Sequence, residues 1–272
     1  MLRVKLVFLA AFALVAAVGL TEMLQTSSAQ KKSSPYGLAA YRDNQCVVCH
    51  LSLTEPLRVS AHFYEWLNSK HSEKGVSCDK CHGGDALAKD KQDAHKGVLR
   101  SSFPQSRLHQ QNLATTCNAC HQETVAAFVQ SSHFQKLKDY GGGPSCTTCH
   151  HHMASSVIYW PPETAELCAA CHKAENNPAA KYAQVPEQAA DVITALNRAD
   201  EVIEWSQFLI SEGRKRRMSL KTEEEELKKQ AQILKAAKVK WHEFELNNSR
   251  QHADQVFAEA TRIKNGLVRK GL

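Results

Sequence analysis

Glycine and proline are scarce in this chain of 272 residues, with only 12 and 8 copies, which excludes a collagen-like or low-complexity polymer. Long hydrophobic runs are lacking as well, although 43% of the residues are hydrophobic. The uncharged apolar run 6–20 is shorter than the roughly 20 residues of a membrane-spanning helix. A polytopic membrane protein is therefore excluded, and one or two folded domains are expected.

A large charge of one sign is also missing. The formal net charge is +6, from 34 basic and 28 acidic residues, and the basic residues form no long stripe interleaved with aromatics. Proteins that bind nucleic acid usually carry such a stripe. We therefore expect no nucleic acid among the partners of this chain.

The first thirty residues have the layout of a secretory signal peptide. Arg3 and Lys5 precede the apolar run, and Ser27 and Ala29 place small residues just before a cleavage point. We expect residues 1–29 to direct export to the periplasm or an equivalent compartment. The alternative is an uncleaved N-terminal anchor, which would hold the exported chain at a membrane.

Ten cysteines are present, and every one lies in the pattern Cys-x-x-Cys-His, which occurs five times. The pattern is typical of covalent c-type haem attachment. Its two thiols bond to the haem, and its histidine supplies the proximal iron ligand. In chain order, motifs 1 to 5 comprise Cys46, Cys49 and His50; Cys78, Cys81 and His82; Cys117, Cys120 and His121; Cys146, Cys149 and His150; and Cys168, Cys171 and His172.

Two other uses of paired cysteines fit this sequence less well. Zinc ribbons combine two Cys-x-x-Cys pairs in one tetrahedral site, so five pairs would leave one over, and zinc does not require a histidine after each pair. A thioredoxin-like redox motif occurs once, near a βαβ pattern. The sequence therefore predicts five covalently attached haems c.

Five haems change what is expected of the fold between residues 30 and 180. The haems would supply much of the apolar core there, so little regular secondary structure is needed beyond short helices around each motif. Because folding would be coupled to haem attachment, we expect the haem-free chain to be largely unfolded in this region.

Nine histidines remain outside the motifs, and seven of them lie between residues 62 and 152. A second axial imidazole makes a haem iron six-coordinate and suited to electron transfer, whereas an open sixth position permits ligand binding and chemistry. The candidate sixth ligands are His62, His71, His95, His109, His133 and His152, with His151 and the weaker Met153 as alternatives to His152. His242 and His252 lie far along the chain, where surface or packed helix residues are expected.

Two of the candidates belong to an internal repeat. The pattern aromatic-x-x-Ser-x-His precedes motif 2 with Trp66 and His71, and it precedes motif 4 with Phe128 and His133. The stretch from motif 1 to motif 2 therefore looks like a first copy of the stretch from motif 3 to motif 4. We expect each aromatic and its histidine to lie along one short helix that covers a haem face.

These motifs resemble the multihaem cytochrome c families over roughly residues 40–175. The segments Cys81-His82-Gly83-Gly84-Asp85 and Gly143-Pro144-Ser145-Cys146 add to the resemblance. The chain is similar to the doubled Cys-x-x-Cys-His cytochromes, a group of exported electron carriers. It resembles more distantly the superfamily of pentahaem nitrite reductase and octahaem hydroxylamine oxidoreductase. It departs from the nitrite reductases, whose active haem has a lysine as proximal ligand, because all five motifs here end in histidine.

The composition of residues 186–272 shifts to Ala, Glu, Lys and Leu, with apolar residues at helical spacing. We predict two or three antiparallel helices, the first ending near Gly213 and the second beginning at a capping box of Thr222 and Glu225. A break is expected at residues 247–249. These helices would close over the haem domain or pair with a second subunit to form a homo-oligomer.

The predicted fold class is therefore mainly α. A haem-packed multihaem cytochrome c domain with little regular structure, residues 30–180, is followed by a C-terminal antiparallel helical domain, residues 186–272. The favoured function is electron transfer between other redox proteins through closely spaced, mostly bis-histidine haems. The alternative is an oxidoreductase that acts on a small nitrogen or sulfur compound at one haem with an open axial site.

Overall fold

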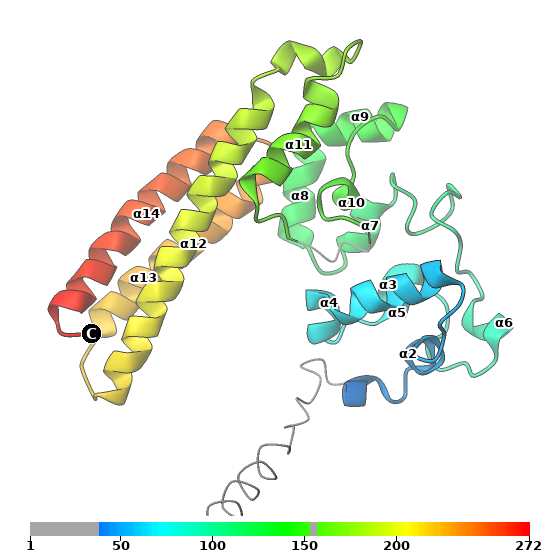
Figure 1. Cartoon of the computed structure of the whole chain (residues 1–272), viewed down its shortest axis with the longest axis horizontal. Coiled ribbons are helices and arrows are strands. Elements are labelled where there is room, and N and C mark those ends of the chain that lie inside the picture. The colour runs from blue at the N-terminus through cyan, green and yellow to red at the C-terminus, as the bar shows by residue number, and fades with distance from the viewer. Residues whose placement is uncertain (1–37, 153–156) are drawn as a thin grey trace, which may run out of the picture.

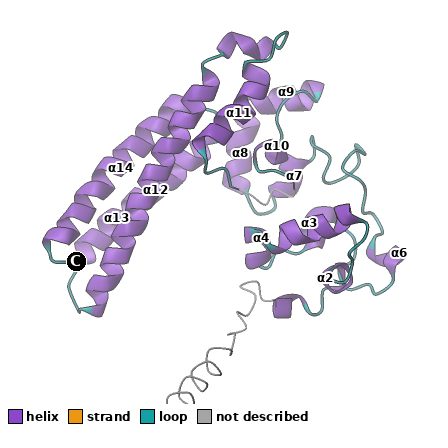
Figure 2. Cartoon of the chain, viewed as in Figure 1, coloured by secondary structure: helices purple, strands orange, loops and turns teal. Residues whose placement is uncertain are grey.

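The computed structural model describes residues 38–152 and 157–272 (Figure 1). The predicted signal peptide or anchor, residues 1–29, and Met153 lie outside the described residues. The described chain consists of helices and loops and contains no strand, so the predicted mainly α fold class is confirmed (Figure 2). None of the helices in this described part combines the length and apolar character that a bilayer crossing demands.

Short helices make up the part of the chain that carries the five motifs. The helices there span four to twelve residues, and most of them are one to three turns long. In chain order they are η1 (Leu38–Tyr41), α2 (Gln45–His50), α3 (Leu57–Leu67), α4 (Lys70–Glu73), α5 (Cys78–His82), α6 (Lys91–Ala94), α7 (Leu113–Cys117), α8 (Gln122–Gln130), α9 (Ser132–Tyr140), α10 (Cys146–Cys149) and α11 (Pro161–His172).

Each motif lies on or beside one of these helices. Motif 1 forms most of α2, motif 2 forms α5, and the first four residues of motif 4 form α10. Motif 5 ends α11, and motif 3 spans the end of α7 and the turn before α8. Local capping explains several of the starts. The Asn44 side chain accepts a hydrogen bond from the Val47 N–H at 3.2 Å, and two prolines occupy the first turn of α11, where their missing N–H groups cost nothing.

A short 3₁₀ helix, η2 (Pro178–Tyr182), leads into three long helices: α12 (Val185–Lys215), α13 (Lys221–Trp241) and α14 (Leu246–Arg269). They form an antiparallel bundle, drawn from yellow to red in Figure 1. Its core contains fully buried small residues such as Ala199, Ala253 and Ala260, which allow the helices to approach closely. Leu234 and Leu267 fill the space between them.

The predicted helix ends differ from the observed ones in detail. Helix α12 runs past Gly213, because this glycine packs inside the bundle, where a β-carbon would lie 2.4 Å from Leu220 Cδ1. The predicted capping box is wrong: Leu220 is the N-cap of α13, with no side-chain cap, and Thr222 lies within the first turn. The break between α13 and α14 falls at residues 242–245, before the predicted Asn-Asn-Ser.

The bundle contacts the haem-motif region through two elements. Helix α11, which ends in motif 5, packs along α12, and helix α13 contacts α8. Lys235 of α13 pairs with Glu123 of α8 at 2.7 Å. The three long helices therefore lie beside motifs 3 to 5.

Candidate functional site

Consecutive Cys-x-x-Cys-His motifs are neighbours in space, in the order of the chain. The thiols of adjacent motifs lie close enough to shift one another's pKa values, and two of them are hydrogen-bonded. Cys46 and Cys78 join motif 1 to motif 2, and Cys81 and Cys117 join motif 2 to motif 3. Cys117 and Cys146 join motif 3 to motif 4, and Cys149 and Cys168 join motif 4 to motif 5.

Most of these thiols are held in their neutral form. Burial, with Cys46 nearby, raises the pKa of Cys78 to about 12, and burial also raises the pKa of Cys81 and Cys149. Burial and the neighbouring Cys149 raise the pKa of Cys168 to about 11. A catalytic cysteine or a thiolate metal site needs surroundings that lower the thiol pKa, so these thiols fit covalent attachment to a buried apolar group better.

Four of the five motif histidines face a histidine from elsewhere in the chain. The ring centroids of each pair are 6.0 to 6.2 Å apart. In each pair one imidazole belongs to a motif and the other to a different helix or its flanking turn. The pairs are His50 with His95, His121 with His71, His150 with His242, and His172 with His133.

This spacing is the one that a shared metal requires. Two imidazoles that bind one ion from opposite sides, each through a bond of about 2 Å, have ring centroids about 6 Å apart. Two imidazoles in direct contact can lie closer, as do the tilted rings of His62 and His152, whose centroids are 4.2 Å apart. The four pairs therefore fit haem iron, with the cysteines of the same motif beside one member of each pair.

The protonation of these imidazoles also suits metal binding. Burial lowers the pKa of His50, His71, His82 and His242, and it lowers the pKa of His133 to about 4. A neutral imidazole has a ring nitrogen lone pair to offer a metal, whereas a protonated one does not. Nδ1 of His133 and Nδ1 of His172 are buried without a hydrogen-bond partner among the described residues.

Two of the partner histidines have an oriented ring. Nδ1 of His95 hydrogen-bonds to the Lys91 carbonyl oxygen at 2.8 Å, and Nδ1 of His242 bonds to the Lys238 carbonyl oxygen at 2.8 Å. When Nδ1 donates to a backbone carbonyl, Nε2 is left as the metal-binding nitrogen, and such bonds are common behind metal-ligating histidines. A helix backbone thus fixes the ring of each residue toward its motif.

The internal repeat explains how the other two partners are placed. Ser131 ends α8 and caps α9: its hydroxyl donates to the Phe128 carbonyl oxygen at 2.6 Å and accepts from the Phe134 N–H at 3.1 Å. Ser69 does the same between α3 and α4, donating to the Trp66 carbonyl oxygen at 2.6 Å. The expectation of one short helix is therefore wrong, because the serine breaks it into two.

The break between the two helices separates the aromatic residue of the repeat from its histidine. The aromatic residue before the serine is buried, with Trp66 exposed by 5% and Phe128 by 8%. The histidine two residues after the serine lies on the next helix and faces the first motif beyond its own repeat. His71 faces motif 3, and His133 faces motif 5.

The surroundings of motif 2 differ from those of the other four. His82 lies near His62 and His152, which both contribute to lowering its pKa after burial, the main cause. The rings of His62 and His152 lie 4.2 Å apart, and His152 Nδ1 is 3.1 Å from a carboxylate oxygen of Glu65. The structure therefore brings two of the predicted ligands, instead of one, to this motif.

The remaining histidines have other surroundings. His109 lies partly buried before α7 and, within the described chain, is not brought to the imidazole of a motif histidine, so its ligand role stays a prediction. His151 bonds to Glu163 at 2.7 Å. His252 is exposed and bonds only within α14, to the Asn248 carbonyl oxygen at 2.9 Å, as expected for a surface residue.

His242 is the functional candidate that the sequence analysis missed. Its distance along the chain from motif 4 suggested a surface or packed helix residue, but it is partly buried, and its ring centroid lies 6.2 Å from that of His150. The available signal was its place at the end of a long amphipathic helix, directly before a break. Helix ends are where side chains can be directed at a neighbouring part of the fold.

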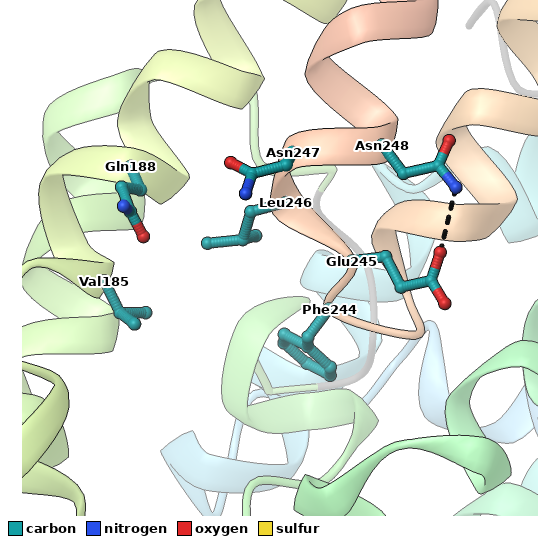
Figure 3. A pocket seen from close by; sticks show the side chains of 7 residues that line it. All are labelled: Val185, Gln188, Phe244, Glu245, Leu246, Asn247 and Asn248. Carbon is teal, nitrogen blue, oxygen red and sulfur yellow. Dashed lines mark hydrogen bonds between the residues drawn. The ribbon is translucent and has the colours of Figure 1, made fainter.

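A cavity of about 410 Å³ opens beside the turn that follows His242. Figure 3 shows Val185 and Gln188 of α12 on one side, facing Leu246 and Asn247 at the start of α14. Phe244 lines the same cavity, and its ring lies 4.0 Å from that of His133. The cavity therefore adjoins the His133–His172 pair.

Comparison with known proteins shows similarity to polyhaem cytochromes. The chain is 28% identical to the C-type polyheme cytochrome OmcC of Geobacter sulfurreducens over 171 residues, covering 52% of this chain and 21% of OmcC. It is 31% identical to the C-type polyheme cytochrome OmcB of the same species over 128 residues, covering 44% of this chain and 15% of OmcB. The chain thus spans about a fifth or less of these relatives.

No family model and no solved structure matches the chain. The two relatives support the resemblance to multihaem c-type cytochromes. The more distant resemblance to the nitrite reductase and hydroxylamine oxidoreductase superfamily stays a prediction.

Proposed function

We propose that this chain is an exported pentahaem c-type cytochrome that transfers electrons between other redox proteins. The observation that carries the proposal is the set of four histidine pairs 6.0 to 6.2 Å apart, each containing one motif histidine. The polyhaem relatives support the cofactor class. Export rests on the sequence of residues 1–29 alone.

When bound, haem c supplies an iron that accepts and releases one electron. The part of the chain is to hold five such groups in place. The two cysteines of each motif would attach a haem covalently, and the motif histidine would bind its iron. His95, His71 and His133 would bind the iron at motifs 1, 3 and 5 from the opposite side, and His62 is the favoured partner at motif 2.

The arrangement of the motifs suits a relay. Because thiols of consecutive motifs lie beside each other, neighbouring haems would follow the chain order from motif 1 to motif 5. The partly buried surroundings of His50, His71, His82 and His133 would limit the access of water to the iron. Both features favour passage of electrons over chemistry on a substrate.

The haem count tests the cofactor part of the proposal. Purified protein should contain five haems per chain by the pyridine haemochrome assay, and Cys78→Ser with Cys81→Ser should contain four. A count of five in this double variant would contradict covalent attachment at motif 2.

Spectroscopy of the oxidised protein tests the electron-carrier part. With all five irons six-coordinate, electron paramagnetic resonance (EPR) should show low-spin ferric haem only, and cyanide or nitrite should not change it. A high-spin ferric component that shifts when nitrite or hydroxylamine is added would overturn the simple carrier.

That second outcome would support an oxidoreductase acting on a small nitrogen or sulfur compound. One feature favours motif 2 as its place: His152 and the carboxylate of Glu65 form a hydrogen-bonded pair beside His62. A histidine–carboxylate pair next to a haem face could hold or deliver a proton. If motif 2 binds substrate, the high-spin signal should change in the His152→Ala variant.

A further inference from the structure

The end of helix α13 brings a histidine of the C-terminal bundle against motif 4. The ring centroids of His150 and His242 are 6.2 Å apart, and the two ring planes are 13° from parallel. The distance matches the other three pairs, which lie at 6.0 to 6.1 Å. At this separation the space between the two nearly parallel rings suits one intervening iron.

His242 is held in this position from two sides. Its Nδ1 bonds to the Lys238 carbonyl oxygen at 2.8 Å, which leaves Nε2 as the nitrogen available to a metal. On its other side the partly buried ring faces that of His150. Exposed His252 makes the same kind of bond, so the partial burial and the facing His150 ring are what set His242 apart.

The turn after His242 contains a residue in an unusual backbone conformation. Phe244 has φ +62°, a left-handed conformation that is unusual for a bulky residue. Its ring lies 4.0 Å from His133 and 6.5 Å from Phe128, and 6.4 Å from Trp241. The conformation is maintained by this packing, and strained residues of this kind cluster at functional sites.

The turn therefore contacts two of the haem sites at once. His242 faces motif 4, and Phe244 packs on His133, which faces motif 5. The Lys235–Glu123 pair and the packing of α13 on α8 fix the same end of the helix.

We infer that His242 is the second axial ligand of the iron at motif 4, and that the α13–α14 turn is part of the haem-binding machinery. The inference rests on the proposed function, because it requires a haem at motif 4. It extends that function by assigning a ligand from the C-terminal bundle, so the bundle would complete a cofactor site as well as cover it.

The test compares His242→Ala with His252→Ala in the full-length haem-loaded protein. His252 is a matched control because its Nδ1 makes the same bond to the carbonyl four residues earlier, but it is exposed and lies away from the motifs. Both variants should retain five haems. In His242→Ala one of the five haems should become high-spin in the ferric EPR spectrum, and imidazole should restore it, while His252→Ala should match the unaltered protein.

The shape of the EPR signal that disappears in His242→Ala is a second test of the inference. Parallel axial imidazole planes give a rhombic low-spin signal, whereas nearly perpendicular planes give a signal with a large maximal g value. The pairs at motifs 3 and 5 are 73° and 77° apart, against 13° for His150 and His242. His242→Ala should therefore remove a rhombic signal and leave the large-g signals in place.

A second variant covers the case in which His242→Ala does not fold. In His242→Met the replacement can still bind iron and fills similar space, so the protein should stay low-spin while the reduction potential of one haem rises. Five unchanged low-spin haems in His242→Ala, or five unchanged potentials in His242→Met, would overturn the inference. A wild-type count below five haems would instead contradict the proposed function.

Discussion

The role of each histidine in this chain depends on what lies next to its ring. His95 and His109 were both predicted as ligands, and both lie between motifs 2 and 3. Only His95 comes within 6.1 Å of a motif imidazole, that of His50. Its ring is also fixed by the bond from Nδ1 to the Lys91 carbonyl oxygen.

These two residues give a matched pair of substitutions. In His95→Ala one haem should become high-spin, because the iron at motif 1 would lose its proposed second ligand, and EPR of the oxidised protein measures this. His109→Ala should leave the spectrum unchanged. A high-spin signal in His109→Ala alone would show that the pairing at motif 1 is wrong.

Gly143 is needed because two parts of the backbone approach each other closely. A β-carbon there would lie 2.2 Å from the His133 carbonyl oxygen and 2.6 Å from the Leu137 nitrogen. The glycine thus lets the segment before motif 4 pack on α9, the helix that carries His133. Neighbouring Gly142 has open space around the same position.

Gly143→Ala should therefore destabilise the folded protein, while Gly142→Ala should not. Overpacking of this kind costs about 1 to 3 kcal/mol in the free energy of unfolding. Urea denaturation followed by circular dichroism measures both variants. Equal midpoints for the two would show that the backbone at Gly143 can move without cost.

The sequence predicted the residues of the site unevenly, for physical reasons. The motifs are recognisable because attachment chemistry fixes the spacing of two thiols and an imidazole within five residues. His71 and His133 could be found because a repeat preserves their distance from a serine and an aromatic. His242 could not be assigned to motif 4, because its approach to His150 depends on how α13 packs, and its place at a helix end does not say which motif it would face.

At the scale of elements, the serine that joins two short helices has the clearest effect. Ser131 satisfies backbone groups of both α8 and α9, and the resulting bend places Phe128 in the interior and His133 toward motif 5. Adjacent Ser132 is exposed.

Ser131→Ala should lower the free energy of unfolding by about 1 kcal/mol, the usual cost of losing an N-cap. Ser132→Ala is the control, and exposed substitutions of this type change stability by less than about 0.5 kcal/mol. Chemical denaturation of both variants tests the difference. If Ser132→Ala is the more damaging of the two, the capping role of Ser131 is wrong.

Helix existence was easier to predict than helix ends. The 3.6-residue periodicity after residue 186 reflects burial of one face, and three long helices are present. Their ends depend on tertiary contacts instead: Gly213 continues α12 because Leu220 and Leu272 pack against it, and the side chain of Thr222 caps nothing. The short helices around the motifs carry no periodicity from which they could be found.

At the scale of the whole molecule, the apolar core is concentrated in the bundle. One cluster of 18 buried residues is drawn from α12 to α14 and their connection, whereas the cluster around motif 1 contains only Tyr41, Val47 and Trp66. The cluster around motif 1 is thus much smaller than that of the bundle, and bound haems would add apolar surface to the motif region.

The haem-free chain should therefore be folded only in part. Expressed without haem attachment, it should keep the helical signal of residues 185–269, and limited proteolysis should degrade residues 38–152 first. Circular dichroism and mass spectrometry of the resistant fragment measure this. Protection of both regions to the same extent would show that the polypeptide alone specifies the motif region.

The four histidine pairs also differ in when their two members are made. His71 and His133 are synthesised before the motifs that they face, and His95 follows motif 1 within the same region of the chain. His242 follows motif 4 only after α11, α12 and all of α13. During synthesis and maturation, the iron at motif 4 would then be the last of these four to be closed, so a chain truncated after α11 would carry a haem open to oxygen and other small ligands.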